Sequence, residues 1–198
     1  MAKSDLAMVM ELHQQQVLAE LQQLTEKLYR RNPRELHKTP GITLEQQVAR
    51  IFNDPLTIDW ATTDGQTSIQ ALRLAFDPEF NGDRVYAFCA GLTDMILAAY
   101  GHRQEFFMVN DADPQKLHDS ARNIEIAAWK MNHDRTATGE LFLLSNSQLG
   151  EQQNYSFERL FGKLIAQQDT IAIVTANRTN HNIKNLVQAL ASIVFIPI

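Results

Sequence analysis

The stretch GDRVYAFCAGLTDMILAAY, residues 82–100, decides the fold of this chain. It is apolar on nearly every side when placed on a helix, and it carries one carboxylate, Asp94, in its middle. A helix that is apolar all round belongs in the centre of a bundle, where every face has a neighbour to pack against. We therefore expect a buried central helix that ends at Gly101 and is surrounded by other helices.

The segment before it, residues 5–29, is free of Gly and Pro and predicts one long helix. Its seam has alternating spacings of four and three residues, the period of a narrow coiled-coil contact, at Met10, Gln14, Val17, Leu21, Leu24 and Leu28. Either the half from Val17 to Leu28 packs on its own domain while the polar first half projects, or the helix is a spacer or a dimerising helix. We divide the chain accordingly into residues 1–31, a long N-terminal spacer or packing helix, and residues 32–198, a helical globular domain.

Capping residues and prolines mark the other helices. The runs Asn32-Pro33-Arg34-Glu35 and Thr43-Leu44-Glu45-Gln46 have the pattern of helix starts, and Asp113-Pro114 opens another. Further helices are expected over residues 68–76, 114–131, 156–174 and about 183–194. The fold class is mainly α: a single-domain bundle of about seven helices around the buried central helix.

Two short segments have an extended pattern. LTIDW at residues 56–60 and LFLL at residues 141–144 are the candidates for one small β-hairpin. The second lies within residues 134–154, which are rich in Thr, Gly, Ser, Asn and Gln and predict the longest loop, the place for any lid.

Composition excludes several classes of protein. A formal net charge of −5 over 198 residues argues against a general nucleic-acid binder. The one cysteine, Cys89, lies in the central helix and predicts a buried thiol with no internal disulfide. No apolar run approaches the roughly 18 residues that span a bilayer, and the start of the chain lacks the features of a signal peptide, so the chain as it stands is expected to be soluble.

Asp94 is the first candidate for chemistry. An isolated buried carboxylate is costly, so Asp94 needs a partner, and Arg122, in the middle of the helix over residues 114–131, is the natural one. Two interpretations stay open: a structural tie between two core helices, or a weak catalytic candidate pair whose carboxylate has a shifted pKa in a cleft.

A basic segment, YRRNPRELHK at residues 29–38, is the second candidate. Cations beside a helix N-terminus suit a phosphate, a carboxylate or an anionic lipid headgroup, and the candidate binding residues are Arg30, Arg31, Arg34, His37 and Lys38. The alternative is a solvated surface whose cations pair with the chain's own acids.

Motifs for other chemistry are missing from the sequence. The six histidines form no HExxH pattern, and no GxSxG, GxxxxGK[ST] or GxGxxG motif occurs. We therefore expect no metal site and no cofactor.

Three segments resemble an uncharacterised group of proteobacterial lipoproteins: YRRNPRELHK, GDRVYAFCAGLTDMI and EFFMVNDADPQKLHDSARNIEIAAWK. The resemblance implies a periplasmic protein held to a membrane through an N-terminal anchor, with the first helix as a spacer. The lipobox cysteine of such proteins does not occur in this sequence.

The function predicted from these features is binding or interaction in the cell envelope, with another envelope protein or an anionic small molecule as partner and no nucleic acid. Two alternatives are an enzyme that uses the buried Asp/Arg pair, and a structural protein that self-associates through its N-terminal helix.

Overall fold

The computed structural model describes residues 4–107, 112–149, 152–179, 183 and 194–198. These residues form seven α-helices, one short 3₁₀ helix and a two-stranded hairpin. The helices are α1 (Asp5–Arg31), α2 (Pro33–Leu36), α3 (Leu44–Phe52), α4 (Ser68–Leu74), α5 (Arg84–Ala99), α6 (Pro114–His133) and α7 (Ser156–Thr179), with η1 at Ala61–Thr63. The mainly α fold predicted from the sequence is confirmed.

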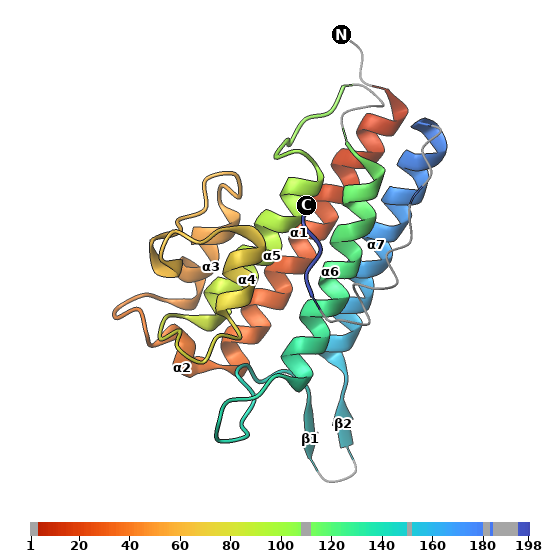
Figure 1. Cartoon of the computed structure of the whole chain (residues 1–198). Coiled ribbons are helices and arrows are strands. Elements are labelled where there is room, and N and C mark those ends of the chain that lie inside the picture. The colour runs from red at the N-terminus through yellow and green to blue at the C-terminus, as the bar shows by residue number, and fades with distance from the viewer. Residues whose placement is uncertain (1–3, 108–111, 150–151, 180–182, 184–193) are drawn as a thin grey trace.

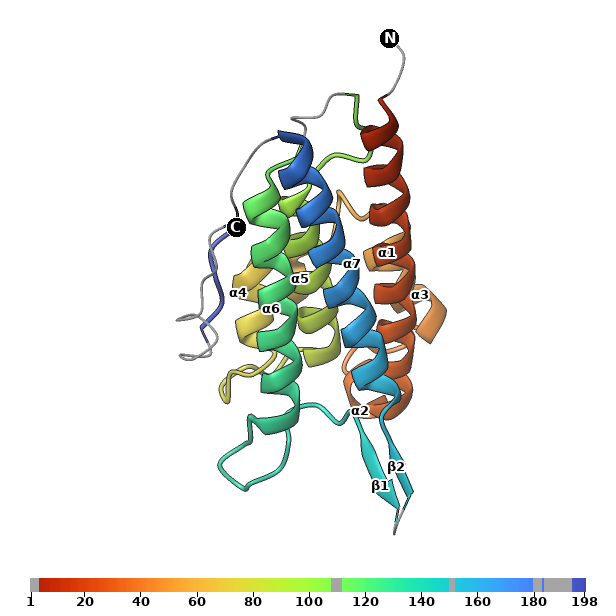
Figure 2. The same cartoon turned by 90° about the vertical axis from the view of Figure 1, so that its right-hand side faces the viewer.

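Helix α5 is the centre of the molecule, as the sequence predicted. The long helices α1, α6 and α7 run beside it along a common axis, and α3 and α4 cover its other side (Figure 1, Figure 2). Of the sixteen residues of α5, only Arg84, Asp94 and Ala98 are not fully buried. Cys89 is buried as expected, and burial raises the pKa of its thiol to about 12, so it acts as a small apolar side chain.

Helix α1 packs along its whole length. The predicted seam is buried, and Leu6, Ala7 and Met10 of the first turns also belong to the core. The first half therefore does not project as expected, because its apolar residues continue the stripe that faces α5 and α7. The apolar seam that predicted a coiled coil packs against α5 and α7 of the same chain.

The hairpin forms at different residues from those predicted. Strands β1 (Ser147–Leu149) and β2 (Gln152–Asn154) pair antiparallel, whereas residues 56–60 and 141–144 belong to neither strand. Strands that are close in sequence pair at a small entropic cost of loop closure, whereas the two predicted segments are far apart in the chain. The 141–144 segment instead buries Phe142 and Leu143 in the core.

The C-terminal segment completes the cover over α5. Residues 194–198 cross in front of α5 between α4 and α6 (Figure 1, Figure 2), with Phe195 and Ile196 buried. Asn123 of α6 holds this segment by both of its amide atoms: its Nδ2 donates to the Ile196 carbonyl at 2.8 Å, and its Oδ1 accepts from the Ile196 amide at 2.7 Å. The helix predicted over residues 183–194 lies almost entirely outside the described residues.

Gly91 sets the distance between α4 and α5. A Cβ atom added there would lie 2.8 Å from both the Leu72 amide nitrogen and the Ser68 carbonyl oxygen, and neither backbone atom can move aside freely. We expect Gly91→Ala to lower the free energy of unfolding by about 2 to 3 kcal/mol, measured by chemical denaturation. Gly162→Ala on α7 is the matched control, because a Cβ there meets open space, and it should raise the free energy of unfolding by about 0.5 to 1 kcal/mol. Equal effects of the two changes would contradict this account of the α4–α5 contact.

Candidate functional site

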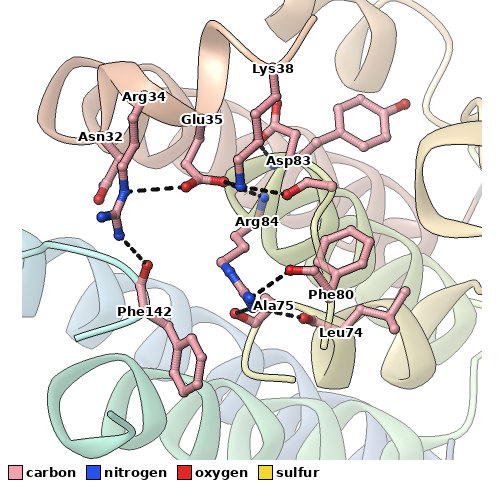
Figure 3. A network of polar contacts seen from close by, with 12 residues as sticks. Asn32, Arg34, Glu35, Lys38, Leu74, Ala75, Phe80, Asp83, Arg84 and Phe142 are labelled. Atoms are coloured by element: carbon pink, nitrogen blue, oxygen red, sulfur yellow. Dashed lines mark hydrogen bonds and ion pairs between the residues drawn. The ribbon is translucent and has the colours of Figure 1, made fainter. Parts of the chain in front are cut away.

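The predicted basic cluster does not act as one site. Arg34 and Lys38 turn toward Glu35, a buried carboxylate of α2 (Figure 3). Lys38 Nζ lies 2.8 Å from Glu35 Oε2 and also donates to the Gly82 carbonyl at 2.8 Å. Arg34 Nε lies 3.3 Å from Glu35 Oε1, and its Nη2 donates to the Phe142 carbonyl at 3.0 Å. These two cations are therefore engaged in holding the fold.

Glu35 in turn closes the N-terminus of α5. Its Oε2 accepts from the Arg84 amide at 2.8 Å, and Asp83, the N-cap of α5, accepts from the Tyr86 amide at 2.9 Å. Asp83 also accepts from the Tyr29 hydroxyl at 2.7 Å and from Gln47 Nε2 at 2.9 Å. Burial raises the pKa of Asp83, against the opposing effect of its three donors. Two carboxylates thus satisfy backbone donors that a buried helix start would otherwise leave unpaired.

The Arg84 side chain ties this helix start to the end of α4. Its guanidinium donates to the carbonyls of Leu74 (3.3 Å), Ala75 (3.1 Å), Asp77 (2.8 Å) and Phe80 (2.6 Å) (Figure 3). The same group lies 4.8 Å from the centre of the Phe142 ring. A planar group with five donors can bind several carbonyls at once, and the Arg84 guanidinium uses its donors on carbonyls of the protein itself. The network of Figure 3 is therefore structural.

The remaining basic residues of the segment face solvent. Arg30 reaches Glu26 at 3.5 Å with 70% of its side chain exposed, an exposed pair of little energetic weight. Arg31 and His37 are exposed, and within the described part of the chain no ion pair is formed by either. Of the predicted cluster, Arg30 lies beside a cavity formed by described residues.

That cavity, which we call the α1–α7 pocket, lies between the end of α1 and the start of α7. It has a volume of about 300 Å³ and is lined by Gln23, Glu26, Lys27, Arg30, Ser156, Arg159 and Leu160. Three cations from two helices face one carboxylate, so the pocket carries an excess of positive charge. The Ser156 hydroxyl at the start of α7 is buried and has no hydrogen-bond partner among the described residues.

Lys27 contacts an aromatic ring and is repelled by a neighbouring cation. Its ammonium lies 4.4 Å from the centre of the Phe157 ring, a cation–π contact with a buried side chain. Desolvation lowers the pKa of Lys27, and the charge of Arg159 lowers it further. An anion between the two would relieve this repulsion.

Sequence reasoning missed Lys27 and Arg159 because they are far apart in the chain. One local signal did exist: Arg159 lies in the first turn of a long helix, where the helix dipole disfavours a cation.

The predicted pair of Asp94 and Arg122 is wrong, since each residue has a different neighbour. Arg122 Nη2 lies 2.6 Å from Asp169 Oδ2 of α7 and 3.3 Å from Glu125 Oε1. Asp94, with 18% of its side chain exposed, lies 3.8 Å from Nδ1 of His102. The apolar stripe of each helix sets its rotation about its own axis, and with it the direction of its polar side chains. The pair offered as a catalytic candidate therefore does not exist.

Asp94→Asn is accordingly expected to be tolerated. Burial raises the pKa of Asp94 above 3.8, and His102 lowers it only in part. A carboxyl with a raised pKa in the folded state makes the free energy of unfolding fall as pH rises from about 4 through the raised value. The asparagine variant should therefore match or exceed the wild type by up to about 1 kcal/mol at pH 7, and the difference should vanish near pH 4. Urea unfolding across this range measures it, and a loss of several kcal/mol at pH 7 would show a charge pair after all.

Other kinds of site are not evident in the described residues. Among them, no group of three or more His, Cys, Asp and Glu side chains is placed to hold a metal ion. None of the described helices is both long and apolar enough to cross a membrane. No protein-family model, curated protein or solved structure matches this chain, so its function is inferred from its own geometry.

Proposed function

We propose that this protein binds a small oxyanion of the phosphate class in the α1–α7 pocket. The observation that carries the proposal is the convergence of Lys27, Arg30 and Arg159 on one cavity at the N-terminus of α7. The proposal retains the anionic partner predicted from the sequence but moves the site: only Arg30 of the predicted residues belongs to it.

The pocket has the groups that recognise a tetrahedral oxyanion. Guanidinium groups bind phosphate oxygens through paired hydrogen bonds, and an ammonium adds a compact charge. The start of a long helix adds partial positive charge. An uncharged ligand would leave the repulsion between Lys27 and Arg159 unrelieved.

Inorganic phosphate is therefore expected to stabilise the folded protein. A ligand at about 100 times its Kd adds about 2.7 kcal/mol, and each kcal/mol raises the melting temperature of a protein of this size by about 2 to 4 °C. Thermal unfolding with increasing phosphate, at ionic strength held constant with sodium chloride, measures the effect. Arg159→Gln should weaken binding about tenfold or more, since it removes charged hydrogen bonds to the anion.

Arg73→Gln is the matched control. Arg73 is an exposed cation of α4, outside the lining of the α1–α7 pocket, so its loss changes net charge equally but leaves the pocket intact. If both variants lowered the phosphate effect equally, or if chloride alone reproduced it, the stabilisation would be general screening and the proposal would fail.

We also propose an envelope location, as the resemblance to the lipoprotein group implies. Its support is the likeness of the three segments quoted above. Labelling of the native gene product with radioactive palmitate tests it: incorporation that depends on a cysteine encoded just upstream supports an anchor, and its absence removes one.

A further inference from the structure

The exposed side of α1 carries no charge over most of the length of the helix. Helix α1 forms the right-hand edge of the bundle in Figure 2. Between positions 8 and 23 its exposed residues are all uncharged, and we call them the outer face of α1: Met8, Val9, Leu12, Gln15, Gln16, Ala19, Gln22 and Gln23. The solvated side of a helix usually carries charged residues, whereas the core of a protein interface is depleted of them. The composition of the outer face is therefore that of an interface.

The acidic residues of the same stretch are turned toward the rest of the protein. Glu11 Oε1 accepts from the Phe106 amide at 3.0 Å. Glu20 is buried, and its Oε1 lies 3.0 Å from Lys163 Nζ of α7. Large apolar side chains are turned outward instead, since Met8 is 51% exposed and Leu12 is 64% exposed. This part of α1 thus holds its carboxylates against its own chain and presents apolar and amide groups to a partner.

The spacing of the outer face favours another helix as the partner. Its central members follow one another at intervals of four, three, four and three residues, the period of a coiled-coil seam: Met8, Leu12, Gln15, Ala19 and Gln22. The small side chain of Ala19 lets a second helix approach closely, because the distance between packed helices depends on the side chains at their contact. This seam is separate from the buried one that packs against α5 and α7.

We propose that the outer face of α1 packs on the same face of a second copy of this chain, with the two α1 helices antiparallel. Asp5 lies at one end of the face and Arg30 at the other, and both are exposed. Parallel helices would bring like charges together, whereas antiparallel helices bring Asp5 of each copy near Arg30 of the other. Amide groups both donate and accept, so Gln15 and Gln22 complement the amides of a second copy. A two-fold interface requires such a self-complementary surface.

Sedimentation equilibrium of the full chain tests the dimer, in buffer free of phosphate because Arg30 also lines the α1–α7 pocket. We expect the mass to rise with concentration from 22.5 kDa to twice that value. Leu12→Glu places two like charges in the interface and removes apolar contacts, so it should raise the dissociation constant at least about tenfold. Leu56→Glu is the matched control, because Leu56 is also exposed but lies between α3 and η1, and it should leave the dissociation constant unchanged.

Disulfide trapping tests the orientation of the two helices. Cys89 is buried, so an introduced cysteine on α1 supplies the accessible thiol. In an antiparallel seam with Asp5 near Arg30, position 12 of one copy lies opposite position 22 of the other. A mixture of Leu12→Cys and Gln22→Cys chains should therefore form a disulfide between the two variants under mild oxidation, and Leu12→Cys alone should form little.

Each alternative result overturns the proposal. A mass of 22.5 kDa at every concentration leaves the outer face to a helix of another protein. A dimer that Leu12→Glu leaves intact uses another surface. Efficient trapping of Leu12→Cys with itself shows parallel helices. None of these results bears on phosphate binding, so the proposed function would stand in every case.

Discussion

Arg84→Met is expected to lower the free energy of unfolding by about 3 to 5 kcal/mol, because its half-buried guanidinium donates four charged hydrogen bonds that each contribute about 1 kcal/mol. The change removes the guanidinium donor from four carbonyls at the end of α4 and in the following turn, two of which, those of Leu74 and Asp77, also accept from backbone amides. It also removes the attraction between the Arg84 guanidinium and the Glu35 carboxylate. Equilibrium unfolding in urea, followed by circular dichroism, measures the loss.

Two further variants isolate the cause. Arg84→Lys keeps the charge but cannot reach several carbonyls or stack on Phe142, and it should lose about 2 kcal/mol. Arg73→Met removes an exposed cation of α4 and should stay within about 0.5 kcal/mol of the wild type. If Arg84→Met behaved like Arg73→Met, water would be replacing the guanidinium at all four carbonyls and the structural role would be refuted.

Asp83→Ala is the second large effect, with an expected loss of at least about 3 kcal/mol. The substitution removes the N-cap of α5, which typically contributes about 1 kcal/mol. It also leaves the Tyr29 hydroxyl and the Gln47 amide without their acceptor, and a buried donor without an acceptor costs about 1 to 3 kcal/mol. Burial of both partners prevents water from taking the place of the carboxylate.

Asp113→Ala is the matched control, since Asp113 caps α6 through one bond to the Gln115 amide and is exposed. It should lose only about 1 kcal/mol, the ordinary value of a cap. If Asp83→Ala does not fold, Tyr29→Phe tests the same contact, because it removes one of the donors to Asp83. It should lower the free energy of unfolding by about 1 to 2 kcal/mol. Equal losses for the two cap variants would show that the buried donors contribute nothing.

Both large predictions concern residues that the sequence did not single out. Asp83 and Arg84 lie within the stretch that decided the fold, yet their partners come from α1, α2, α3 and the turn after α4. Their role depends on how several helices meet at one point, and spacing within one segment carries no information about that.

The sequence by itself determined the helices and the buried position of α5, because capping, proline and apolar periodicity act within a few residues of the chain. Only the tertiary structure decided where the charges go. Arg34 and Lys38 join Glu35, Arg122 joins Asp169, and Arg30 meets Lys27 and Arg159 at a cavity. Charge pairing reaches only a few ångströms, so it depends on the rotation and register of helices that are distant in sequence, and these emerge when the apolar faces pack.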